Sequence, residues 1–220
     1  DLHRVLYPEI RKRKWALYPH WHSPNIVSTW YIGRIKQIWF MKLRYLRSES
    51  QVRDIESRMG VPRPLDTAET QYTKHPMLDI RLDADFLAIE LLLTNQAWWD
   101  AQNLKNKIAA DPESRRHFLS ILKSLGNDFL FGGWPDSSRP ETITTAADLT
   151  QRDRLERWFS AFEPGYNWFR LGIWYSDRDD YRLRTGRIVE EVLYRFEQLY
   201  PVYEFLLWTP ENDYRNRSKL

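Results

Sequence analysis

The sequence predicts an α+β fold in which helices pack against an antiparallel sheet of about four strands. Residues 77–93 alternate apolar and polar side chains in two short runs, which is typical of a half-buried hairpin. Two further strands are predicted near 128–131 and 167–175, with apolar residues at helical spacing between them. We therefore expect helices to cover one face of the sheet. A basic, mostly helical N-terminal segment precedes this body.

The composition excludes several classes of protein. The chain of 220 residues is 42% hydrophobic and 15% aromatic, which is too apolar for a disordered or low-complexity protein. Cysteine is absent from the sequence, so a disulfide scaffold and thiol catalysis are excluded. No uncharged apolar run approaches the roughly 18 residues that a membrane span requires. We predict a globular, cytoplasmic protein with no membrane contact.

The charge is distributed unevenly along the chain. Residues 1–64 carry 13 basic and 5 acidic side chains, a net charge of +8, whereas residues 65–220 carry a net charge of −5. Residues 61–76 contain three prolines and have no apolar periodicity, which is typical of a linker. We therefore divide the chain into a basic, aromatic-rich segment, 1–64, and an α+β body, 65–220.

Within the basic segment, prolines predict irregular structure over residues 1–25. Residues 30–46 fit both a helix and a strand, because their apolar side chains recur at both spacings. We favour a helix, since the Ser48-Glu49-Ser50-Gln51 sequence begins a second short helix that ends near Gly60.

The body opens with the clearest pattern in the sequence. If residue 82 pairs with residue 87, six aliphatic side chains share one face of a hairpin, and a one-residue slip would expose half of them. These side chains are Leu78, Ile80, Leu82, Leu87, Ile89 and Leu91. The opposite face then carries Asp79, Arg81, Ala88 and Glu90.

Helices are predicted after the hairpin and between the later strands. The first covers 95–109, and the second begins at Asp111-Pro112 and ends at Gly126. A polar loop over 135–148 is followed by a helix capped by Thr150. A long helix over 185–200 is expected to be kinked or interrupted by Pro201, and 211–220 to form a solvated tail.

Two carboxylates give the sharpest chemical signal. In the predicted register Asp79 and Glu90 lie side by side, where like charges repel unless a cation or an arginine neutralises them. A solvated polar face bridged by Arg81 is the simpler interpretation. The alternative is a divergent metal-dependent nuclease centred on the two acids, although Leu92 stands where a lysine would hold the reacting phosphate.

Other candidate sites have weaker patterns. His20 and His22 have the spacing of a zinc-binding pair on a strand, but we interpret them as surface or hydrogen-bonded side chains. Residues 177–180 are acidic without the spacing of a calcium loop. The tryptophans at 98, 99, 134, 168 and 174 would form a pocket for a base or sugar if stacked, but core packing is the more common role. The usual glycine-rich phosphate-binding motifs are missing, so nucleotide binding lacks its usual sequence support. We predict no cofactor and assign no metal-binding residues, and the nuclease alternative keeps metal binding at Asp79 and Glu90 open.

The basic segment supplies the functional hypothesis. Its arginines and lysines are interleaved with tryptophan and tyrosine, and phosphate neutralisation combined with ring stacking is how proteins bind single strands. The candidate nucleic-acid-binding residues are Arg11, Lys12, Arg13, Lys14, Arg34, Lys36, Lys42, Arg44 and Arg47.

The sequence thus predicts a non-enzymatic accessory subunit of a larger assembly, which contacts nucleic acid or an acidic partner through this segment. The metal-dependent nuclease is one alternative. A purely structural subunit that makes only protein–protein contacts is the other.

Overall fold

The computed structural model describes most of the chain. The described residues are 2–20, 27–32, 35–60, 72–83, 85–133, 144–176, 180–184 and 186–214, with side chains described outside 27–40. Within these ranges, α+β architecture is confirmed.

A single antiparallel sheet forms the centre of the fold. Its strands are β1 (Tyr18–Pro19), β2 (Val27–Ile32), β3 (Ile35–Leu46), β4 (Met77–Asp83), β5 (Leu87–Leu93), β6 (Leu130–Gly132), β7 (Thr144–Thr145) and β8 (Phe169–Tyr175). The strand order is β1-β3-β4-β5-β8-β6-β7. β1 pairs with the C-terminal end of β3, and β2 pairs with the N-terminal part of β3. The described sheet therefore has eight strands, about twice the predicted number.

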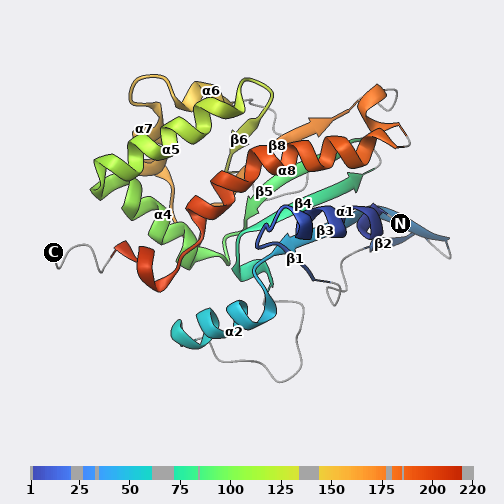
Figure 1. Ribbon diagram of the computed structural model, residues 1–220, viewed down its shortest axis with the longest axis horizontal. Coiled ribbons are helices and arrows are strands. Elements are labelled where there is room, and N and C mark those ends of the chain that lie inside the picture. The colour runs from blue at the N-terminus through green and yellow to red at the C-terminus, as the bar shows by residue number, and fades with distance from the viewer. Residues whose placement is uncertain are drawn as a thin grey trace.

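Helices cover mainly one face of this sheet. They are α1 (Leu2–Lys12), α2 (Glu49–Arg58), α4 (Trp98–Ala110), α5 (Pro112–Leu125), α6 (Ala146–Leu149), α7 (Arg154–Ala161) and α8 (Arg187–Leu206). Figure 1 shows α8 and α1 lying across the sheet, with α4 to α7 gathered beside one end of it. Three short 3-10 helices, η1 (Tyr72–Lys74), η2 (Tyr181–Leu183) and η3 (Pro210–Asn212), complete the described elements.

The predicted hairpin is confirmed in its register. Leu82 pairs with Leu87, Ile80 with Ile89 and Asp79 with Glu90. Except for Leu82, which is 46% exposed, the aliphatic face joins the main core with α8, whose Val192, Phe196 and Leu199 are fully buried. On the opposite face, Val52 of α2 packs with Leu46, Met77 and Leu92 in a smaller cluster.

The predicted helix over 30–46 is wrong, because this segment forms parts of β2 and all of β3. Tyr45 pairs with Leu78 and Arg44 with Asp79, so that β3 is the next strand of the sheet beyond β4. Helix propensity is a weak preference that tertiary pairing overrides. The side chains of Leu43 and Tyr45 pack on the core, as the two-residue period predicts. The short helix after Ser48 is confirmed by a capping box with Gln51.

Two helices contain prolines that were predicted to break, kink or interrupt them. Residues 2–12 form α1 despite Pro8, and α8 continues through Pro201 to Leu206. Residues on both sides of each proline are buried, including Leu6 and Ile10 in α1, and Val202 and Tyr203 in α8. Burial of these apolar side chains outweighs the missing hydrogen bond.

Several boundaries differ from the sequence prediction in smaller ways. The predicted loop over 135–148 contains β7 and the start of α6, which is capped by Thr145. The helix predicted to be capped by Thr150 begins at Arg154. Asp111 caps α5 as predicted, accepting a hydrogen bond from the Glu113 amide. In the described part of the chain no helix has the combined length and apolarity that crossing a bilayer requires.

Candidate functional site

The first candidate site is the α1 basic cluster, defined as Arg11, Lys12, Arg13 and Lys14. All four side chains are exposed, and they lie where α1 ends. Cations are favourable at the C-terminal end of a helix because the carbonyl dipoles point there. Lys14 has a φ of +57°, a left-handed conformation that normally selects glycine. The helix therefore ends on a lysine at a position where glycine would cost less.

Two aromatic rings are built into this cluster. The guanidinium carbon of Arg11 lies 5.6 Å from the Tyr18 ring centre, and that of Arg13 lies 5.6 Å from the Trp15 ring centre. The Trp15 ring stacks on Tyr200 of α8, whose hydroxyl accepts a hydrogen bond from the Ala16 amide at 2.9 Å. The cluster is thus anchored to the helix that crosses the sheet.

One acidic residue modifies the charge of the cluster. Glu9 pairs with Arg13 at 2.7 Å and with Lys12 at 3.8 Å. The hydrogen bond from Arg13, followed by the charge of Lys12, lowers the pKa of Glu9 below its ordinary value. Glu9 is therefore ionised at neutral pH, and the cluster with Glu9 carries a net charge of about +3.

The other predicted basic residues do not join this cluster. Arg44 faces Asp79 inside the sheet at 3.6 Å, and Lys42 is half-buried on the same strand. Arg47 is only 2% exposed and donates to Asp100. Lys36 lies in β3 with its side chain outside the described set, and Arg34 lies outside the described residues.

The second candidate site is the pair of hairpin carboxylates, and the predicted solvated face is wrong. Glu90 and Arg170 are both 0% exposed. Arg170 of β8 donates to both oxygens of Glu90, at 2.8 Å from Nε and 2.7 Å from Nη2. Arg81 lies 3.4 Å from Glu90, and Asp79 is held by Arg44. Arginines on β3, β4 and β8 compensate the two acids, which is why this face tolerates burial.

A glycine makes the central pair of this network possible. Gly172 faces Glu90 directly across the β5–β8 pairing. A Cβ atom placed on Gly172 would lie 2.5 Å from the Cβ of Glu90 and 2.7 Å from the Ile89 carbonyl oxygen. No side chain fits there, and the Glu90 carboxylate contacts Arg170, two residues before Gly172 on β8.

In this geometry the two carboxylates bind arginines inside the sheet, which is a structural role. Among the described residues, no three histidine, aspartate or glutamate side chains are grouped so as to hold a metal ion. His20 is buried, with its Nε2 2.8 Å from the Arg47 carbonyl oxygen, whereas His22 and residues 177–179 lie outside the described residues.

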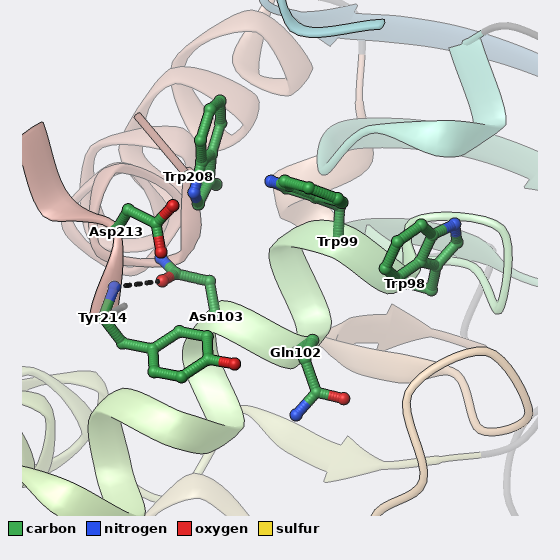
Figure 2. A pocket seen from close by; sticks show the side chains of 7 residues that line it. All are labelled: Trp98, Trp99, Gln102, Asn103, Trp208, Asp213 and Tyr214. Atoms are coloured by element: carbon green, nitrogen blue, oxygen red, sulfur yellow. Dashed lines mark hydrogen bonds between the residues drawn. The ribbon is translucent and has the colours of Figure 1, made fainter. Parts of the chain in front are cut away.

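The third candidate is the aromatic pocket, lined by Trp98, Trp99, Gln102, Asn103, Trp208, Asp213 and Tyr214. Figure 2 shows the three indole rings and the Tyr214 ring lying around a common space. Trp98 and Trp99 come from the first turn of α4, and Trp208 follows the end of α8. Trp99 meets Trp98 at 70° and Trp208 at 87°, with ring centres 5.0 and 5.6 Å apart.

A buried ion pair positions Trp208. Asp100 accepts hydrogen bonds from the Arg47 guanidinium and, at 2.6 Å, from the Trp208 amide. Arg47 also donates to the Trp208 carbonyl oxygen at 3.1 Å. Both backbone groups of Trp208 are thus held, by Arg47 just after β3 and by Asp100 of α4. Arg47 was predicted from the sequence as a binding residue, and the structure places it here, behind the aromatic pocket.

The chain after Trp208 is fixed to α4 in a similar way. The Asn103 side chain accepts from the Tyr214 amide at 3.1 Å and donates to Asn212 at 3.2 Å. Residues 211–214 are therefore docked, which corrects the predicted solvated tail over this range. The sequence signal was Thr209-Pro210, an N-cap followed by proline, which begins η3.

Of the tryptophans proposed from the sequence, Trp98 and Trp99 line this pocket. Trp168 packs against the cluster beneath α2, Trp174 lies under Arg170, and Trp134 lies outside the described residues. Sequence reasoning missed Trp208, because its contact with α4 joins residues more than a hundred positions apart.

Comparison with protein-family models gives no match for this chain, and a search of curated proteins finds no significantly similar sequence.

Proposed function

We propose that the protein is a non-enzymatic subunit of a larger assembly that contacts nucleic acid through the α1 basic cluster. The observation that supports this proposal is a run of four exposed cations, two of which lie over the partly buried rings of Tyr18 and Trp15. Cations neutralise phosphates, and aromatic rings accept unstacked bases. Lys14 places the fourth cation at a left-handed backbone position, where lysine costs about 1 kcal/mol relative to glycine.

The proposal predicts binding of single-stranded nucleic acid with a defined salt dependence. Four phosphate contacts give a slope of about −2.8 in log K against log salt concentration for a single strand. The affinity would thus fall about 50-fold for a fourfold increase in salt. Fluorescence anisotropy with a labelled oligonucleotide measures both quantities.

The decisive variant replaces Arg11, Lys12, Arg13 and Lys14 with alanine. A matched control removes the same charge from exposed arginines that pair with carboxylates on α2 and near α7, namely Arg53, Arg58, Arg154 and Arg157. The α1 variant should lose binding, whereas the control should change the affinity less than about threefold. Equal losses in both would reduce the effect to net charge and refute the proposal.

Lys14→Gly separates function from folding. Glycine relieves the left-handed backbone, so the free energy of unfolding should rise by about 1 kcal/mol. Nucleic-acid affinity should fall, because one phosphate contact is lost. Binding of an acidic peptide in preference to every oligonucleotide would reassign the α1 basic cluster to a protein partner and reject the nucleic-acid proposal.

A further inference from the structure

The geometry of the aromatic pocket points to a binding site for a quaternary or methylated ammonium group. Cations are attracted to the faces of aromatic rings, and recognition of such groups uses several rings around one position. The near-perpendicular contacts of Trp99 with Trp98 and Trp208 produce a corner of indoles. Tyr214 and Gln102 close the side opposite this corner in Figure 2.

The charge of the lining agrees with a cationic ligand. The described lining residues include one carboxylate, Asp213, and no lysine, arginine or histidine. Asp213 is mostly buried, so its charge acts through a medium less polarisable than water. Gln102 and Asn103 contribute neutral amides. An anionic ligand would meet repulsion from Asp213, together with ring faces that carry partial negative charge.

The size and shape of the pocket favour a compact head group. Its volume is about 100 Å³, smaller than the roughly 300 Å³ or more of pockets that hold drug-sized ligands. A nucleobase or sugar normally lies on a flat platform or between parallel rings, and indoles that meet at 70° and 87° provide neither arrangement. A methylated ammonium group is rounded and needs no parallel faces.

The walls are fixed before any ligand arrives. Asp100 and Arg47 hold the Trp208 backbone, and Asn103 holds the Tyr214 amide. Preorganised walls lose little conformational entropy when a ligand binds, which improves affinity without new contacts. Trp98 is 42% exposed, so the pocket opens to solvent at its rim. A ligand presented on a small molecule or on the end of a peptide side chain can reach it.

Two sources share this chemistry: free cholines and methylated lysine side chains. Isothermal titration of the full chain distinguishes them, using choline, its uncharged carbon isostere 3,3-dimethylbutan-1-ol, a trimethyllysine peptide and the same peptide with lysine. We expect one of two results: choline binds at least about fivefold more tightly than its isostere, or the trimethyllysine peptide binds at least about fivefold more tightly than the lysine peptide. The tighter of the two ammonium ligands identifies the source. The inference is overturned if neither ammonium ligand exceeds its own counterpart.

Variants then assign the binding to the pocket. Trp98→Ala removes a partly exposed ring, and Asp213→Asn removes the charge with little change of shape. Each should weaken ammonium binding at least about fivefold. Tyr181→Ala, which removes a 60% exposed ring outside the pocket, should leave it unchanged. Wild-type affinity in both pocket variants, or an equal loss in Tyr181→Ala, would refute the site. If Trp98→Ala fails to fold, Asp213→Asn and the wild-type ligand comparison still decide.

Discussion

Replacing Glu90 with glutamine tests the charge network in the middle of the sheet. Glu90→Gln keeps the length of the side chain and removes its charge. Arg170 is fully buried, and both of its hydrogen bonds described above go to Glu90. Arg81, also buried, lies 3.4 Å from the same carboxylate. The variant therefore leaves two buried guanidinium groups without the carboxylate that lies between them.

The size of the effect follows from this burial. Removing one partner of a buried ion pair typically costs about 3–5 kcal/mol, because a charge is left uncompensated in a poorly polarisable interior. The dependence of unfolding free energy on urea is about 2–3 kcal/mol per molar for a chain near the upper end of the usual size range. The urea midpoint of Glu90→Gln should therefore fall by about 1–2 M.

Equilibrium urea unfolding, followed by tryptophan fluorescence, measures this shift. Glu49→Gln is the matched control, because Glu49 pairs with Arg53 on the surface of α2 with both side chains more than half exposed. Its expected cost is below about 1 kcal/mol. Changing Glu90 and Arg170 together to methionine should cost much less than the two single changes added. Equal costs for Glu90→Gln and Glu49→Gln would refute the assignment of a buried network.

Two further predictions concern packing and pH. Gly172→Ala should lower the free energy of unfolding by at least about 1–3 kcal/mol, because its Cβ would lie 2.5 Å from that of Glu90; an unchanged urea midpoint would contradict this contact. Partial burial lowers the pKa of His3, which lies 3.0 Å from the Tyr45 hydroxyl, so the unfolded chain takes up the proton first. The free energy of unfolding should therefore fall as the pH drops below 6.5 and through the lower pKa of the folded state. His3→Gln should reduce this fall, and an identical pH profile for the variant would show that His3 does not contribute.

The sequence predicts best where both partners of a contact are close in the chain. The β4–β5 hairpin follows from alternation, because only one register puts its six alternating aliphatic side chains on one face. The caps at Ser48 and Asp111 are equally local. The helix prediction for residues 30–46 was wrong because the partner of this segment is distant in the chain. The apolar side chains fit both helical and strand spacing, and the segment forms a strand because it pairs with β4, on the far side of the predicted linker.

The candidate sites show the same division. The exposure of the α1 basic cluster is a local property, since four consecutive cations cannot all be buried without partners. The burial of Asp79 and Glu90 depends on Arg44 and Arg170, which belong to neighbouring strands that are distant in sequence. The aromatic pocket needs α4 and the chain after α8 to meet, and no periodicity encodes that meeting.

The strand order has a consequence for how the protein folds. β8 lies between β5 and β6, although it is made after both of them. β4 and β5 pair through contacts close in sequence, and β3 pairs with β4 across residues 47–76, so that this half of the sheet forms without β8. β6 and β7 have no place in the sheet until β8 has paired with β5. We expect β8 insertion to be the slow step of folding, with the exposed edge of β5 as the surface at risk of aggregation until it occurs.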